Sequence, residues 1–193
     1  VCRLAVHVLG EFFLHLKKSM EFDLEKTAGH LISKTGDTNK FLRDDCHIAL
    51  DHLVENLNPI KVIALLTSES YLHHKNPVVR ATASRLLAYT IERLGCSKAL
   101  SGVKDLTDKL IPAVAKLAQD GSQEARGFAK AALRILIQHP DFDRILKKNL
   151  TPNNLRNMEK ILDGIRYPNT KRSSGGPGRN FRSNASRASR QTY

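Results

Sequence analysis

Three short polar stretches of the sequence contain the residue types that could bind a partner. They read KTGDTNKFLR at 34–43, HHKNPVVR at 73–80 and QDGSQEAR at 119–126. Lysine and arginine donate charge-assisted hydrogen bonds to carboxylates, and the free N–H groups at a helix start add donors with positive partial charge. If the three stretches lie side by side, we expect a ridge of donors that suits the carboxylates of an acidic protein surface.

No pattern of side chains in the sequence predicts catalysis or a metal site. His7, Glu11 and His15 are four residues apart, but they do not form the HExxH arrangement, and a solvated helix edge is the favoured interpretation. His73 and His74 lack further ligands at metal-site spacing and are interpreted as turn residues. We therefore expect no enzyme activity, no cofactor, no bound metal and no small-molecule substrate.

Composition and charge favour a helical protein with acidic partners. Of the 193 residues 41% are hydrophobic, but only 6% are aromatic and tryptophan is absent, so the core must be built from leucine, isoleucine, valine and alanine. The formal net charge is +12, and seven of the cations lie from Arg166 onward, with no acidic residue after Asp163. Such a balance favours nucleic acid, anionic lipid or an acidic protein surface.

The cysteines and the hydropathy pattern point to an intracellular protein that does not cross a membrane. Cys2, Cys46 and Cys96 are too widely spaced for a disulfide framework or a zinc site, and reduced thiols are expected. Cys46 is interpreted as a small core residue. No stretch approaches the roughly 18 consecutive apolar residues of a membrane span.

Apolar residues recur with helical spacing along the chain, and no strand pattern is found. Asn58-Pro59, Asn76-Pro77 and Thr151-Pro152 each combine a capping residue with a proline in the first turn, Ser122 is a further cap, and Gly95 is a predicted helix end. The predicted helices cover about 1–18, from 24 onward, about 40–56, from 59 onward, about 77–94, about 104–119, about 123–138, a short segment after Pro140, and from 152 onward.

Four helices begin with the same pattern, an arginine followed by a core residue three and seven positions later. The arginines are Arg3, Arg43, Arg80 and Arg126, at spacings of 40, 37 and 46 residues. A helix pair that recurs every 40–47 residues or so is the signature of HEAT-type repeats, which stack through their apolar faces. The predicted fold class is therefore all-α, a HEAT-repeat α-solenoid of stacked antiparallel helix pairs.

The first copy of this pattern begins at the second helix of a pair. We therefore expect that the array continues upstream of Val1 and that the apolar side of helix 1–18 is uncovered, which favours instability or self-association. The stripe on that side comprises Val1, Leu4, Ala5, Val8, Leu9, Phe12 and Leu16.

The motifs KTGDTNKFLRDDC, HHKNPVVRATASRLL and LAQDGSQEAR resemble the third, fourth and fifth repeats of a TOG domain, the tubulin-binding HEAT-repeat module of microtubule regulators. IERLG at 91–95 and QHPDFD at 138–143 extend the likeness to the crescerin group of TOG array regulators of axonemal microtubules. The resemblance covers about residues 1–165. It implies that 1–166 is a partial TOG domain that lacks its first repeat and half of its second.

The resemblance also implies a function: binding of αβ-tubulin through the turns inside the repeats, regulation of microtubule dynamics, and a place in the cytoplasm on the cytoskeleton, in the cilium. The implied tubulin contacts are Lys34, Thr38, Asn39, Lys40, Lys75, Asn76, Arg80, Ser122, Gln123 and Arg126. The duty of Arg43, Arg80 and Arg126 stays open, since arginines at these positions can instead pair with acids of neighbouring repeats. Partner contact is the favoured duty of Lys34, Lys40 and Lys75.

The last 27 residues, 167–193, are rich in arginine, serine and glycine, and they are predicted to be a disordered tail. An alternative function rests on this tail, because its six cations, next to Arg166, can bind nucleic acid by counterion release without sequence preference. The body lacks the aromatic residues that bind single strands by stacking. A HEAT adaptor for peptides is a further alternative that the sequence leaves open.

Overall fold

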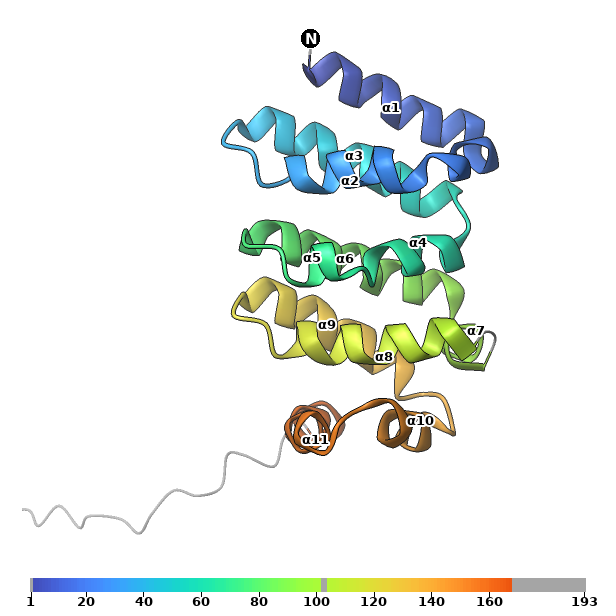
Figure 1. Cartoon of the computed structure of the whole chain (residues 1–193), viewed down its shortest axis with the longest axis vertical. Coiled ribbons are helices and arrows are strands. Elements are labelled where there is room, and N and C mark those ends of the chain that lie inside the picture. Colours follow the sequence, from blue (N-terminus) through green and yellow to red (C-terminus); the bar gives the residue numbers. More distant parts are fainter. Residues whose placement is uncertain (1, 102–103, 168–193) are drawn as a thin grey trace, which may run out of the picture.

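The computed structural model of the chain describes residues 2–101 and 104–167, and in this part all regular structure is helical (Figure 1). Val1 and residues 168–193 lie outside it, so the predicted disordered tail stays a prediction. The elements are α1 (Cys2–Leu16), the 3-10 helix η1 (Lys17–Phe22), α2 (Leu24–Lys34), α3 (Lys40–Asn56), α4 (Pro59–Leu66), α5 (Glu69–Leu72), α6 (Pro77–Leu94), α7 (Cys96–Ser101), α8 (Lys104–Ala118), α9 (Gln123–Leu136), α10 (Phe142–Asn149) and α11 (Pro152–Arg166).

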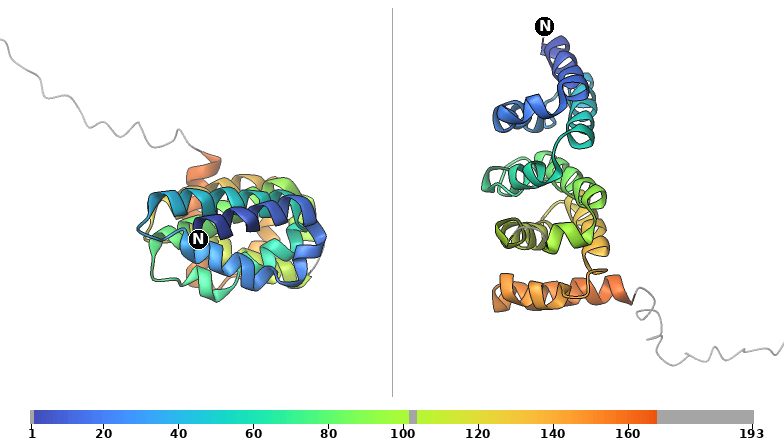
Figure 2. Two further views of the ribbon diagram at one scale, coloured as in Figure 1. Left: turned by 90° about the horizontal axis from the view of Figure 1, so that it is seen from above. Right: turned by 90° about the vertical axis from the view of Figure 1, so that its right-hand side faces the viewer.

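The helices stack as antiparallel pairs in two layers, which confirms the predicted α-solenoid. Figure 2 shows α2, α4–α5 and α8 in one layer and α1, α3, α6 and α9 in the other. The last pair, α10 and α11, packs under α8 and α9 and runs across the direction of the other helices (Figures 1 and 2). A continuous apolar core passes through all the pairs.

The recurring arginine pattern is explained by packing between neighbouring pairs. Three and seven residues after each arginine the side chain or glycine is buried: Val6 and Gly10, Cys46 and Leu50, Ala83 and Leu87, Ala129 and Leu133. At the first of these crossings the backbones lie close together, because a Cβ at Gly10 would be 3.3 Å from the Cα of Ala49. Glycine and alanine at these positions let α1 and α3 approach each other closely.

Most predicted helix boundaries are confirmed, and the differences have local causes. The first helix ends at Leu16 rather than near 18, because Lys17 adopts the left-handed conformation with φ of 46°. Gly95, with φ of 80°, ends α6 as expected.

Three short helices are absent from the sequence-based prediction: η1, α5 and α7. The predicted helix from Pro59 divides into α4 and α5 at Thr67 and Ser68. There the Thr67 hydroxyl donates to the carbonyl of Ala64, and the Ser68 hydroxyl accepts from the N–H of Ser70. Such side-chain bonds to the backbone compete with helix continuation.

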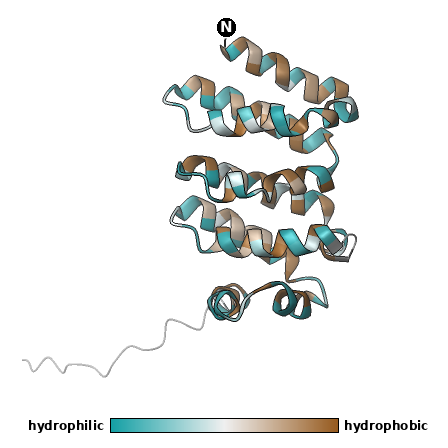
Figure 3. Ribbon diagram, in the orientation of Figure 1, coloured by the Kyte–Doolittle hydropathy of each residue, from teal (hydrophilic) through white to brown (hydrophobic). Residues whose placement is uncertain are grey.

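Most of the described apolar stripe of α1 is uncovered, as expected, but Leu9 is partly buried against the core. Leu4, Val8, Phe12 and Leu16 are at least 40% exposed, whereas Val6 and Phe13 face α3 and are buried. Figure 3 shows apolar colour along the outer side of this first helix. Within residues 2–101 and 104–167 no helix combines the length and the hydropathy that a membrane crossing requires.

Candidate protein-binding ridge

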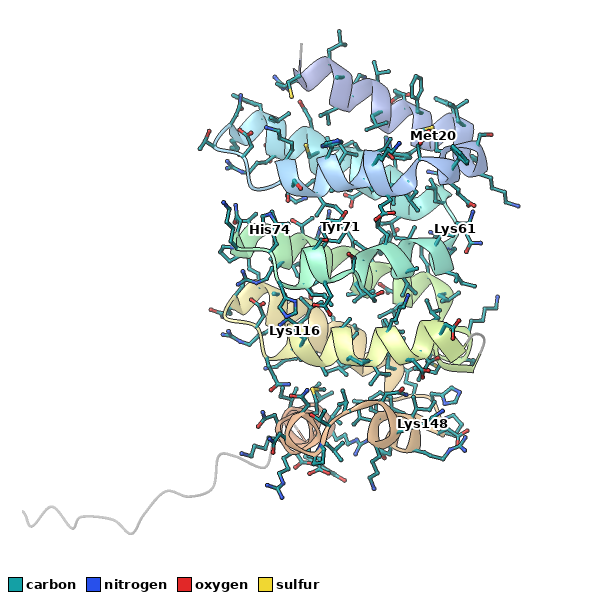
Figure 4. All side chains as sticks on the ribbon, viewed as in Figure 1. Met20, Lys61, Tyr71, His74, Lys116 and Lys148 are labelled. Atoms are coloured by element: carbon teal, nitrogen blue, oxygen red, sulfur yellow. The ribbon has the colours of Figure 1, made fainter. Side chains whose placement is uncertain are left out.

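The three polar stretches meet at one edge of the solenoid. The turn between α2 and α3, residues 35–39, the turn between α5 and α6, residues 73–76, and the turn between α8 and α9, residues 119–122, lie one below another at the left of Figure 1. We call these three turns, with Lys34 at the end of α2 and the first residues of the helices that follow the turns, the turn ridge. Figure 4 shows His74 and Lys116 near this edge.

Each turn of the ridge ends in a side chain that caps the next helix. Asn39 accepts hydrogen bonds from the N–H groups of Phe41 and Leu42, at 3.0 and 3.4 Å. Asn76 accepts from Val78 N–H at 2.9 Å, and Ser122 accepts from Ala125 N–H at 3.4 Å. Asn39, Asn76 and Ser122 therefore start their helices, whatever else they contact.

The arginines four residues after these caps hold the shape of the turns. In each case one guanidinium nitrogen, Nη1, donates to the two carbonyl groups five and six residues earlier in the chain. The pairs of distances are 2.8 and 2.9 Å for Arg43 to Asp37 and Thr38, 2.6 and 3.3 Å for Arg80 to His74 and Lys75, and 2.7 and 2.9 Å for Arg126 to Asp120 and Gly121. The alternative that these arginines have a structural duty is therefore supported.

Two contacts hold neighbouring turns in register. The Asn76 amide donates to the carbonyl of Gly36 at 3.3 Å, which joins the second turn to the first. A Cβ at Gly36 would lie 2.3 Å from the Asn76 amide nitrogen, so this approach requires glycine. Arg80 binds both carboxylate oxygens of Asp120 at 2.7 and 3.1 Å, which joins the second turn to the third.

Asp120 is the acidic partner that the sequence-based prediction did not identify. Burial opposes its charged form, but hydrogen bonds from Arg80 and from the Ser122 N–H, together with nearby positive charges, outweigh burial and lower the pKa of this carboxyl. The signal for the pair was the repeat length, since Arg80 and Asp120 are 40 residues apart. Arg3 also pairs with an acid of the next repeat, Asp45, 42 residues away, but Asp45 lies within α3 and not in a turn. Arg43 and Arg126 form no ion pair within the described part of the chain.

The exposed cations of the ridge are Lys34, Lys40 and Lys75. Lys34 forms an ion pair with Asp37 at 3.1 Å, and the pKa of Asp37 is lowered first by the Asn39 N–H and then by Lys34. In the described residues the ammonium groups of Lys40 and Lys75 have no ion-pair or hydrogen-bond partner, and the side chains of Thr38 and Gln123 are also exposed. Lys40 and Lys75 are therefore the charges that the ridge can offer to a partner.

An open hollow of about 770 Å³ lies beside the ridge, between α5 and α8. Its wall contains acidic Glu69 and Asp108 and basic Lys109 and Lys116, as well as the Arg80–Asp120 pair. Because charges of both signs alternate around it, the hollow has no consistent charge that would select a small ligand.

The candidate metal ligands do not assemble into a site. His15 pairs with Glu11 at 3.3 Å and His73 pairs with Glu69, and in residues 2–101 and 104–167 no three His, Cys, Asp or Glu side chains gather around one point. Cys46 is fully buried and burial raises the pKa of its thiol to about 11, so it stays protonated at neutral pH. Cys46 is a core residue, as interpreted from the sequence.

Stacked HEAT-type helix pairs, with the turns inside the pairs gathered into one ridge, define a TOG-type domain. The family model described as CLASP N terminal matches residues 1–159. The chain belongs to this family. Membership of this family confirms the prediction that the chain is not an enzyme.

Two curated relatives match most of the chain. The mouse (Mus musculus) TOG array regulator of axonemal microtubules protein 1 is 36% identical over 166 residues, which are 86% of this chain and 9% of the mouse protein. The Caenorhabditis elegans crescerin-like protein che-12 is 27% identical over 169 residues, 86% of this chain and 13% of that protein. The chain thus spans about a tenth of the length of these relatives.

Among solved structures, the crystal structure of the MAST/Orbit N-terminal domain superposes on the chain with a TM-score of 0.57. The match covers 83% of this chain and 70% of the other, at 23% sequence identity. This likeness shows the fold.

Proposed function

We propose that this chain is a tubulin-binding module, which binds αβ-tubulin through the turn ridge and takes part in the regulation of microtubules. The names of the mouse and nematode relatives support a microtubule partner, since the first is a regulator of axonemal microtubules and the second a crescerin-like protein. The same names support a place on the cytoskeleton, in the cilium.

One observation of the structure carries the proposal. Lys40 and Lys75 are exposed on turns whose backbone is held by caps, arginines and contacts between turns, and neither ammonium group has a partner in the described part of the chain. Because the backbone of these turns is already held, it need not be ordered on binding, and the cations that it presents suit the carboxylates of an acidic protein such as tubulin.

The proposal divides the ten residues of the predicted site by duty. Lys34, Thr38, Lys40, Lys75 and Gln123 are exposed and are the proposed contacts. Asn39, Asn76 and Ser122 cap helices, and Arg80 and Arg126 stabilise the conformation of the turns. The proposed role of these five residues is to position the contact residues.

Charge reversal on the ridge tests this function. We expect that Lys40→Glu with Lys75→Glu weakens binding of purified αβ-tubulin at least tenfold, because two attractive charges become repulsive. Lys98→Glu is the matched control: it makes the same kind of change at an exposed lysine of α7, at the opposite edge (Figure 1). Its affinity should stay near that of the wild type. Equal binding by the wild type and the double variant would contradict a binding role for the ridge.

A second comparison separates the ridge from the basic tail. Tubulin and nucleic-acid binding by residues 1–166 and by the full chain, each at low and moderate salt, would show how much the six cations of 167–193 contribute. We expect nucleic-acid binding to disappear with the tail while tubulin binding is retained. If removal of the tail abolishes tubulin binding and the Lys75 reversal has no effect, the ridge is not the tubulin site.

A further inference from the structure

Phe41 is an exposed aromatic side chain at the first turn of the ridge. Phe41 directly follows Lys40 in the sequence and is 65% exposed. The cap at Asn39 fixes its backbone, because the Phe41 N–H donates to the Asn39 amide oxygen at 3.0 Å. Single exposed apolar residues are common on protein surfaces, so exposure alone does not identify a binding residue. The reasons to consider Phe41 as a binding residue are its position on the ridge and the residues that contact it.

A neighbouring helix restrains the Phe41 ring. The guanidinium carbon of Arg3, on α1, lies 5.3 Å from the ring centroid, within the range of a cation–π contact. Arg3 is itself fixed by two hydrogen bonds to the carboxylate of Asp45, at 2.6 and 3.2 Å. Asp45 follows Phe41 by four residues, so ring and carboxylate lie on the same face of α3, and Arg3 contacts both.

The second turn carries a smaller apolar side chain at the equivalent place. Val78 follows its cap Asn76 by two residues, as Phe41 follows Asn39, and it is 41% exposed. In the third turn the equivalent residue is Glu124, which is exposed. Each of the two turns that carry an unpartnered lysine, Lys40 or Lys75, therefore also carries an exposed apolar side chain. The third turn has neither an unpartnered lysine nor an apolar side chain at this place.

We propose that Phe41, held in place by Arg3, is the apolar anchor of the ridge, with Val78 as a secondary apolar contact. The surface recognised on tubulin is then an apolar patch bordered by carboxylates, rather than an acidic surface alone. This inference rests on the proposed tubulin-binding function. A ring that is already restrained before binding loses less rotational freedom when it is covered.

The main test compares two phenylalanines. Phe41→Ala should weaken binding of purified αβ-tubulin about tenfold or more, as truncation of an aromatic anchor does. Phe22→Ala is the matched control, because Phe22 is 94% exposed on η1, at the other end of the helix pair. Its affinity should be unchanged. Val78→Ala should cost only a few-fold, because valine buries less apolar area than phenylalanine.

Salt separates the apolar contact from the charged contacts. The factor lost in Phe41→Ala should be the same at low and moderate ionic strength, whereas the factor lost in Lys40→Glu with Lys75→Glu should shrink as salt screens the charges. If Phe41→Ala binds like the wild type while the lysine reversals abolish binding, the anchor is wrong and the tubulin-binding ridge remains. If neither set of variants changes the affinity, tubulin does not bind through the ridge, and that part of the proposed function is wrong.

The positioning role of Arg3 requires a double-mutant cycle. Arg3→Met should weaken tubulin binding a few-fold in the wild-type background and have no further effect in the Phe41→Ala background. Equal losses in both backgrounds would show that Arg3 does not act through the ring. Phe41→Leu keeps a large apolar side chain that can be buried at the interface, so it should retain more affinity than Phe41→Ala. Circular dichroism of each variant verifies that the fold is intact.

Discussion

At the scale of single residues, Arg80 connects two turns of the ridge. It binds two carbonyl groups of its own turn and both oxygens of Asp120 in the next. Its side chain is 18% exposed and that of Asp120 is 7% exposed, so water competes little for this pair. Among the described residues, Arg126 makes only the two carbonyl contacts of its own turn.

This difference predicts unequal losses of stability. Arg80→Ala should lower the free energy of unfolding by about 3 kcal/mol, because it leaves the largely buried Asp120 carboxylate without its partner. Arg126→Ala should cost about 1.5 kcal/mol, the value of a hydrogen bond made by a charged group. Urea unfolding measures both. Arg134→Ala, at an exposed residue of α9, serves as control and should change stability by less than about 0.5 kcal/mol. Equal losses for Arg80 and Arg126 would show that the contact between turns adds nothing.

At the scale of the elements, small residues set how closely helices of neighbouring pairs approach. Gly10 of α1 lies against Ala49 of α3, and the ring nitrogen Nδ1 of His52 lies 3.2 Å from the Gly10 carbonyl oxygen. Gly127 of α9 is different, because a Cβ placed there would have no atom within 4 Å. The two helical glycines are therefore a natural pair for comparison.

Substitutions at these glycines should shift stability in opposite directions. Gly10→Val should destabilise the fold by about 1–3 kcal/mol, because the added methyl groups push α1 away from α3. Gly127→Ala should stabilise it by about 0.5–1 kcal/mol, since alanine restricts the unfolded chain and favours the helix. Thermal and urea unfolding test both variants. A neutral Gly10→Val would mean that the crossing of α1 over α3 tolerates a larger separation.

At the scale of the whole molecule, ion pairs link successive helix pairs. Arg3 with Asp45 joins α1 to α3, Lys61 with Glu21 joins α4 to η1, and Arg80 with Asp120 joins the second turn of the ridge to the third. In Asp45 and Glu21 the hydrogen bond from the basic partner is the main cause that lowers the pKa of the carboxyl. In Asp120 burial is the largest single influence and raises the pKa, but the hydrogen bonds from Arg80 and the Ser122 N–H, together with nearby positive charges, outweigh it and lower the pKa.

These lowered pKa values predict that the fold loses stability in acid. A carboxyl whose pKa is lower in the folded state stabilises the fold above its unfolded pKa, about 4, and this contribution disappears as the pH falls through the folded pKa. We therefore expect Asp120→Asn to be less stable than the wild type by a constant amount between pH 5 and 7. Below about pH 4 the two should converge. Urea unfolding at pH 7, 5 and 3 gives the comparison, and a difference at pH 3 as large as that at pH 7 would rule out ionisation as its cause.

Much of the architecture could be predicted because its signals are local in the sequence. The caps at Asn58, Asn76 and Ser122 lie next to the helices that they start, and Gly95 lies at the end of α6. The helices divided or ended by Lys17, Thr67 and Ser68 were not predicted, because these residues occur within helices as well as at their ends. The expected self-association through α1 remains a prediction, although its apolar stripe is exposed.

The sequence by itself determined the helices, the repeat and the edge at which the turns gather. These depend on apolar spacing and caps within a few residues, and on a phase that recurs every 37–46 residues. Only the tertiary structure decided which side chains of that edge are available. Arg80 turns to a carboxylate 40 residues away, and Arg3 of another helix holds the ring of Phe41, while Lys40 and Lys75 stay without partners in the described part of the chain. The physical reason is that a charged side chain has a partner or lacks one according to the residues that the fold places beside it. Those residues are distant in the sequence, so the local sequence does not reveal them.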